Sequence, residues 1–222
     1  MKSLSFLLSL LVILFTSCKH ETKKETVEPA QELTTAQKIA NAYGFEHWKD
    51  VTQLKFTFNT SRGARSWTWE PKTQNVILVN KGDTIAYNKA KIDSTSLEAD
   101  HAFINDKYWL LAPFQLVWDK SAAISDVTKE NAPISKTEMN KITITYPPDG
   151  GGYTPGDAYD FYFGDDFIIR EWIYRRGNQP EPSLTATWED YQDFNGLKLA
   201  TMHKNADDTW KLWFSDVSVK TE

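Results

Sequence analysis

The chain has 222 residues, and its 30 acidic side chains outnumber 25 basic ones, which gives a net charge of −5 at pH 7. This charge argues against a nucleic-acid partner, because binding to the phosphate backbone needs a clustered basic surface. A chain of this length can bury a substantial core in one domain, whereas its single cysteine excludes a framework of disulfides.

Residues 1–17 have the order of a bacterial signal peptide. Lys2 gives a positive start, residues 4–15 are almost wholly apolar, and Ser17 is a small residue before the expected cleavage point. The apolar core is too short for a good membrane-spanning helix, which needs ~20 apolar residues. We therefore expect residues 1–17 to be removed on export.

The only cysteine, Cys18, follows the apolar core and a small residue directly. This arrangement resembles the lipobox of bacterial lipoproteins, although Phe15 and Ser17 depart from its commonest residues. The resemblance implies that Cys18 is the lipidation site. Lys19, in place of Asp, implies an anchor in the outer membrane of the cell envelope, with the protein facing the periplasm. The alternative is a secreted protein whose signal happens to contain a cysteine.

The segment after the signal divides into a tether and a domain. Residues 18–32 are predicted to be a flexible, lipid-carrying tether, because His20–Gln31 is polar, charged and nearly free of large apolar side chains. No second linker follows, so residues 33–222 are expected to form a single domain.

The domain is predicted to open with a helix that starts at Thr34 or Thr35 and ends before Gly44, with Phe45–Lys49 as a further helical turn. Apolar side chains then alternate with polar ones, which predicts β-strands. The strand segments are residues 53–58, 66–70, 76–79, 85–87, 142–146, 159–163, 167–174, 184–188, 197–201 and 210–214.

The middle of the chain is less regular. A second helix is predicted over Ser94–Asn105, before the apolar segments Tyr108–Leu111 and Phe114–Trp118 that flank Pro113. The fold class is therefore α+β and mainly antiparallel β: a curved, half-open barrel of about ten strands with two or three helices packed on it.

Motifs that would indicate catalysis or metal binding are missing. The sequence has neither a Gly-x-Ser-x-Gly elbow nor a His-Glu-x-x-His zinc motif, and the aspartates of residues 149–166 do not fit the spacing of a calcium loop. We expect a non-enzymatic protein without a metal or cofactor. A hydrolase with an unfamiliar site among His101, Asp106 and Asp119 remains an alternative.

Aromatic side chains are the remaining signal, at 14% of the chain. Residues 167–174 are apolar on both faces of their strand, so the second face must be covered or must bind something. We predict that a monomer binds an apolar small molecule, such as a lipid or acyl chain, in an aromatic-lined groove. The predicted lining residues are Trp67, Trp69, Trp109, Phe161 and Trp172.

Tyr153, in the glycine-rich segment Gly150–Asp157, is a further predicted ligand contact. Glycines with no following Lys-Ser or Lys-Thr pair do not indicate a phosphate loop, and the segment can equally be a long ordered turn. An alternative function is a protein- or carbohydrate-interaction module that uses exposed Trp faces and the Tyr153 loop.

The layout resembles the outer-membrane lipoprotein carrier superfamily over roughly residues 34–220. The resemblance rests on the helix ending in Ala40–Tyr43, on Trp48 and on the long antiparallel sheet with a helical insertion. The strings His101–Asp119 and Gly150–Asp160 also resemble those of uncharacterised small bacterial lipoproteins. The resemblance implies a half-open barrel that shelters acyl chains beneath helical lids.

Overall fold

The computed structural model describes residues 32–149 and 154–222. Leu33–Glu222 form one compact unit, distinct from Met1–Glu32. The predicted signal peptide, Cys18 and Tyr153 lie outside the described residues. Because the whole core described below belongs to Leu33–Glu222, this segment has what it needs to fold on its own.

The unit begins with two short helices, as predicted. Helix α1 (Thr35–Ala42) starts with a capping box, in which Thr34 and Gln37 each accept a hydrogen bond from the other's backbone N–H. Gly44 ends this helix in the left-handed conformation, with φ of 80°. The 3₁₀-helix η1 (Phe45–Asp50) follows and leads into the first strand.

Gly44 also allows two backbone segments to approach closely. A Cβ atom at this position would lie 1.8 Å from the carbonyl oxygen of Gly196, in the turn between the strands of a later hairpin. We expect Gly44→Ala to lower the free energy of unfolding by about 2 kcal/mol or more, through positive φ and overlap with the backbone. Gly82→Ala is the control, since Gly82 also has positive φ but a Cβ atom there would meet nothing within 4 Å. If thermal unfolding showed that both variants lose the same free energy of unfolding, the close approach at Gly44 would not be what makes its glycine necessary.

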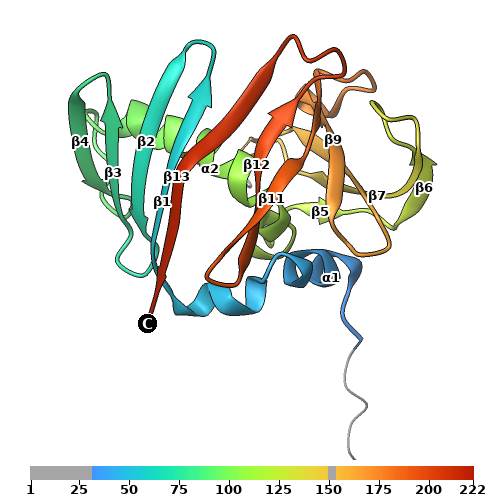
Figure 1. The fold of residues 1–222 in the computed structure, drawn as a ribbon, viewed down its shortest axis with the longest axis horizontal. Coiled ribbons are helices and arrows are strands. Elements are labelled where there is room, and N and C mark those ends of the chain that lie inside the picture. Colours follow the sequence, from blue (N-terminus) through green and yellow to red (C-terminus); the bar gives the residue numbers. More distant parts are fainter. Residues whose placement is uncertain (1–31, 150–153) are drawn as a thin grey trace, which may run out of the picture. The chain divides into compact units, whose positions relative to one another are not determined.

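The larger sheet has seven antiparallel strands in the order β11-β12-β13-β1-β2-β3-β4 (Figure 1). Their bounds are β1 (Val51–Thr60), β2 (Gly63–Glu70), β3 (Asn75–Asn80), β4 (Asp83–Asn88), β11 (Glu189–Phe194), β12 (Leu197–Lys204) and β13 (Lys211–Thr221). The C-terminal strand β13 pairs with β1, so the two ends of the domain sequence meet in the middle of this sheet.

The smaller sheet has six strands in the order β10-β9-β8-β7-β5, with β6 also paired to β7. Their bounds are β5 (Ala123–Ile124), β6 (Thr128–Asn131), β7 (Glu138–Thr145), β8 (Ala158–Phe163), β9 (Ile169–Arg175) and β10 (Leu184–Thr187), with the 3₁₀-turn η2 (Arg176–Asn178) after β9. The sheets meet where β10 lies against β12, and the backbone N–H of Lys204 donates to the Thr187 hydroxyl there.

The predicted α+β class, with antiparallel strands in an open arrangement and helices packed on them, is confirmed. The described residues divide thirteen strands between two sheets that do not close. The additional strands, such as β5 and β6, are short, and every residue of β6 is exposed. Such segments carry no apolar alternation that a sequence pattern could reveal.

The second helix is longer than predicted, because α2 runs from Leu97 to Trp118 and not only to Asn105. Pro113 lies inside it, and the backbone is distorted at Leu111 (φ −120°, ψ 19°). Proline removes one hydrogen bond and crowds the preceding turn, which usually ends or kinks a helix. Here the helix is kinked and continues, because the residues on both sides of the kink are buried in the core.

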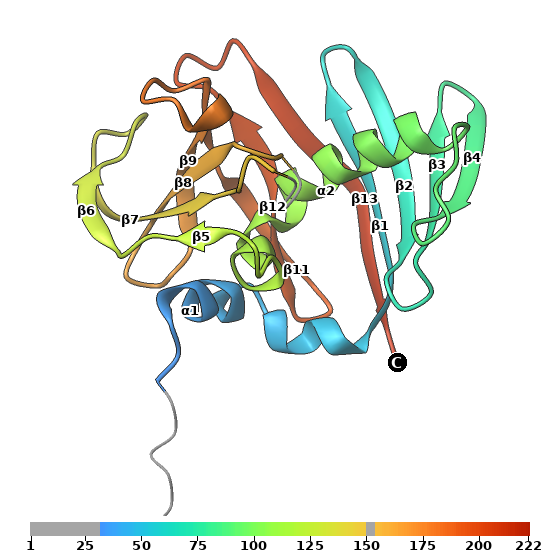
Figure 2. The ribbon, with the colours of Figure 1, turned by 180° about the vertical axis from the view of Figure 1, so that it is seen from behind.

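Helix α2 crosses one face of the larger sheet (Figure 2). Phe103 packs on the indole rings of Trp67 and Trp69 from β2, with ring centroids 5.3 and 5.5 Å apart. None of the helices in the described residues is long and apolar enough to cross a membrane.

Candidate ligand-binding pocket

Helix α2 presents different side chains to the two sheets. Phe103 and Asp106 contact β2 of the larger sheet, whereas Trp109 packs edge-on against Trp172 of β9, with ring centroids 4.4 Å apart. A helix that lies between two sheets leaves space where its side chains do not fill the gap. The space along the smaller sheet forms a pocket.

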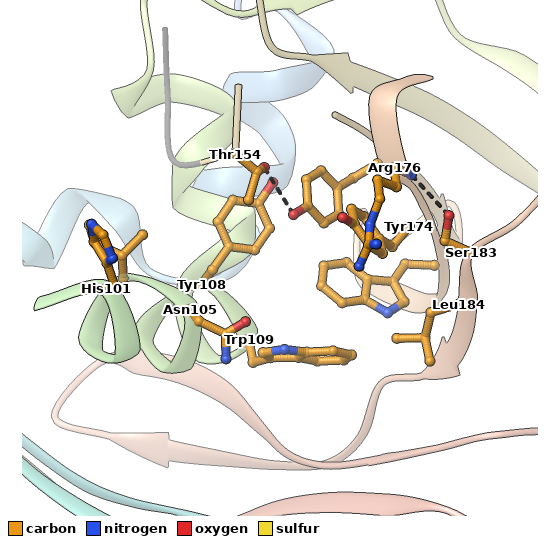
Figure 3. A pocket seen from close by; sticks show the side chains of 12 residues that line it. His101, Asn105, Tyr108, Trp109, Thr154, Tyr174, Arg176, Ser183 and Leu184 are labelled. Carbon is orange, nitrogen blue, oxygen red and sulfur yellow. Dashed lines mark hydrogen bonds between the residues drawn. The ribbon is translucent and has the colours of Figure 1, made fainter. Parts of the chain in front are cut away.

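This pocket has a volume of about 450 Å³, within the range of small-ligand sites. Its walls come from residues 101–109 of α2, from β8, β9 and β10, and from the connections beside them (Figure 3). The lining residues are His101, Ile104, Asn105, Tyr108, Trp109, Thr154, Tyr159, Trp172, Tyr174, Arg176, Ser183 and Leu184.

The floor of the pocket is a group of aromatic rings centred on Tyr159. Its ring lies 4.6 Å from Tyr108, 5.2 Å from Trp172 and 5.1 Å from Tyr174, between centroids. Tyr159 and Tyr174 are paired across β8 and β9, and Trp172 lies two residues before Tyr174, so strand alternation places all three side chains on one face. All residues of β8 are buried, which shows that both faces of this strand are covered.

The rim of the pocket is polar. The Thr154 and Tyr159 hydroxyl oxygens are 3.1 Å apart, and the Ser183 hydroxyl accepts a hydrogen bond from the backbone N–H of Arg176 (Figure 3). Tyr174 donates its hydroxyl proton to Asp157, 2.8 Å away. The pocket therefore combines an apolar floor with a few polar groups at its mouth.

The tyrosines of the pocket are held in the neutral form. Burial raises the pKa of Tyr159, and raises that of Tyr108 well above its usual value. Burial and the hydrogen bond to Asp157 raise the pKa of Tyr174. These phenols are thus hydrogen-bonding groups at neutral pH and not bases.

The predicted lining residues divide into two that line the pocket and three that lie in the core. Trp109 and Trp172 line the pocket. Trp67, Trp69 and Phe161 are buried in the core and do not line it, because α2 covers the two tryptophans and Phe161 is fully buried in β8.

The structure adds residues that the sequence did not single out. Tyr159 and Tyr174 belong to strands that were predicted, so their shared face could have been found from alternation. Tyr108 could not have been placed in the pocket from the sequence, because the helix was expected to end at Asn105. Arg176 follows the last strand residue in a turn whose geometry no periodicity predicts.

The alternative hydrolase site is not assembled. His101 and Asp119 lie at opposite ends of α2, separated by about 27 Å of helix. Asp106 is fully buried and accepts hydrogen bonds from Arg65 Nε and Nη2, at 2.7 and 2.6 Å, and from Trp67 Nε1, at 2.9 Å. Asp119 accepts hydrogen bonds from Ser121 beyond the helix end.

Flat exposed platforms for sugar stacking are also missing among the tryptophans. All nine belong to the described residues, and each is buried or partly buried. Within the described part of the chain, no group of three or more His, Cys, Asp or Glu side chains is arranged to hold a metal ion.

Comparisons with known proteins find likeness among solved structures alone. No protein-family model matches the chain, and a search of curated proteins finds no match. Among solved structures, the chain is similar to a DUF1329 family protein from Desulfovibrio piger, with a TM-score of 0.45 and 9% sequence identity, over 84% of this chain and 92% of that one. Function is therefore best inferred from the pocket itself.

Proposed function

We propose that this protein is a binding protein of the cell envelope that takes an apolar ligand, such as an acyl chain, into the pocket between α2 and the smaller sheet. The observation that carries the proposal is the aromatic floor of the pocket made by Tyr108, Tyr159 and Trp172. Apolar walls with a few polar groups at the mouth are typical of sites that bury most of a small ligand.

The membrane attachment is part of the same proposal. Cys18 carries the lipid, and residues 18–32 link it to the domain, which faces the periplasm from the outer membrane as a monomer. The sequence order before Cys18 supports this assignment. An apolar ligand fits such a location, because the membrane is the nearest source of acyl chains.

Filling the pocket tests the proposal. Leu184 is a partly exposed pocket residue at the start of β10, and an indole in its place would occupy the space without opening a cavity. We expect Leu184→Trp in the Leu33–Glu222 segment to weaken binding of a fluorescent acyl probe at least tenfold, while the unfolding midpoint stays within a few degrees of the unchanged protein. Probe titration and thermal unfolding measure the two effects.

Leu97→Trp is the matched control. Leu97 is 47% exposed, lies on α2 and does not line the pocket. The same substitution there is expected to leave probe affinity unchanged. If both variants bound the probe as tightly as the unchanged protein, the pocket between α2 and the smaller sheet would not be the binding site.

A further inference from the structure

Arg176 differs from the arginines that hold the fold together. Arg65, Arg170 and Arg175 each bond a carboxylate, those of Asp106, Asp166 and Asp160. No carboxylate among the described residues lies within ion-pair distance of Arg176. Its side chain extends into the pocket opposite Tyr108 and Trp109 (Figure 3).

Arg176 shares the rim of the pocket with Tyr174, which is held in place by a buried carboxylate. The Tyr174 hydroxyl raises the pKa of Arg176, and Tyr174 donates its own hydroxyl proton to Asp157. Asp157 is buried, and its other oxygen accepts a hydrogen bond from the backbone N–H of Gly177, with 2.7 Å between nitrogen and oxygen. Both oxygens of this carboxylate are therefore engaged, and its role is to orient Tyr174.

The guanidinium retains capacity for a ligand. Arginine has five N–H donors in a planar fork, which matches the two oxygens of a carboxylate. Arg176 is the one permanently charged group among the lining residues. The apolar floor with Trp109 and Trp172 lies next to it, so charge and apolar surface are side by side in one pocket.

We infer that the ligand is an amphiphilic anion, whose anionic head group binds Arg176 at the rim while its acyl or aromatic body lies against Trp109, Trp172 and Leu184. This inference rests on the proposed function and adds the chemistry of the head group. A free fatty acid and an anionic lipid share that chemistry. Titration with a fatty acid and with an alkyl phosphate of equal chain length distinguishes the two sources.

Matched ligands test the head group. Dodecanoate and dodecanol have the same chain and differ in charge, and isothermal titration of the Leu33–Glu222 segment measures both. We expect dodecanoate to bind about tenfold or more tightly than dodecanol, since hydrogen bonds to charged groups are the stronger ones. Added salt should weaken dodecanoate binding and leave dodecanol unaffected, because Arg176 is exposed to solvent screening. Dodecyl phosphate in the same titration shows whether a phosphate head is preferred.

Arg176→Gln provides the second measurement. We expect it to weaken dodecanoate about tenfold and to leave dodecanol affinity as it was, with Arg62→Gln as the control at an exposed arginine outside the pocket. Equal affinity for dodecanoate and dodecanol in the unchanged protein would overturn the anion inference and leave the apolar pocket in place. Failure of all of these ligands to bind would overturn the proposed function as well.

Discussion

Asp106→Ala is expected to lower the free energy of unfolding by about 3–5 kcal/mol, a large share of the stability of a domain this size. The Asp106 carboxylate is fully buried and joins α2 to β2, through two hydrogen bonds from Arg65 and one from Trp67. Removing it leaves a partly buried guanidinium and a buried indole N–H without their acceptor. Urea unfolding with an unchanged m-value would show that the effect is on stability.

An exposed ion pair is the control for this prediction. Lys72 and Glu222 are 2.8 Å apart, but their side chains are 42% and 72% exposed. Lys72→Ala is therefore expected to cost less than about 1 kcal/mol. A loss of similar size in Asp106→Ala would mean that α2 is held on the larger sheet by apolar packing alone, with Phe103 against Trp67 and Trp69.

The protein is also expected to lose stability in mild acid through His203. This side chain is fully buried on β12, with the rings of Trp109, Trp188 and Phe214 around it, and its Nδ1 lies 3.0 Å from the Thr187 carbonyl oxygen. Burial lowers the pKa of His203 to about 3, although the carbonyls of Thr187 and Trp109 act in the opposite direction. The ring is thus neutral in the folded protein at neutral pH.

The direction of the effect follows from proton binding. As pH falls below the ordinary histidine pKa of about 6.5, the unfolded chain takes up a proton at this position and the folded protein does not. Stability contributed by neutral His203 is complete above that pH and falls until the folded ring is protonated near pH 3. The full loss is on the order of 5 kcal/mol, and about half of it is expected by pH 4.5.

His203→Asn separates this effect from that of the carboxylates, because the amide can keep a donor near Thr187 without titrating. Urea midpoints between pH 7 and 4.5 are expected to fall less steeply in His203→Asn than in the unchanged protein. His101 is exposed, and His101→Asn serves as the control, in which the urea midpoint is expected to fall with pH as steeply as in the unchanged protein. Parallel profiles for the unchanged protein and His203→Asn would refute the assignment to His203.

Local chemistry made most of the elements predictable. The Thr34 capping box and the left-handed Gly44 define α1 within a few residues, and strand alternation placed segments such as Trp67–Trp69 and Tyr159–Phe163 correctly. The continuation of α2 through Pro113 was not predictable from local signals. A proline normally ends a helix, and only burial on both sides of the kink offsets the lost hydrogen bond.

The pocket was predictable only in part. Size and apolarity selected Trp109 and Trp172, which line the pocket, and by the same criteria Trp67 and Trp69, which α2 covers. Arg175 and Arg176 are adjacent and identical in type, yet one bonds Asp160 and the other reaches the pocket.

The sequence by itself determined the helix caps, the alternating strands and the α+β class. These features depend on interactions within a few residues. Tertiary structure decided which aromatic faces are covered and which remain open, because that depends on where α2 lies between two sheets whose strands are far apart in the sequence. For the same reason, only the folded chain distinguishes the buried carboxylate of Asp106, which joins α2 to β2, from the guanidinium of Arg176, which extends into the pocket.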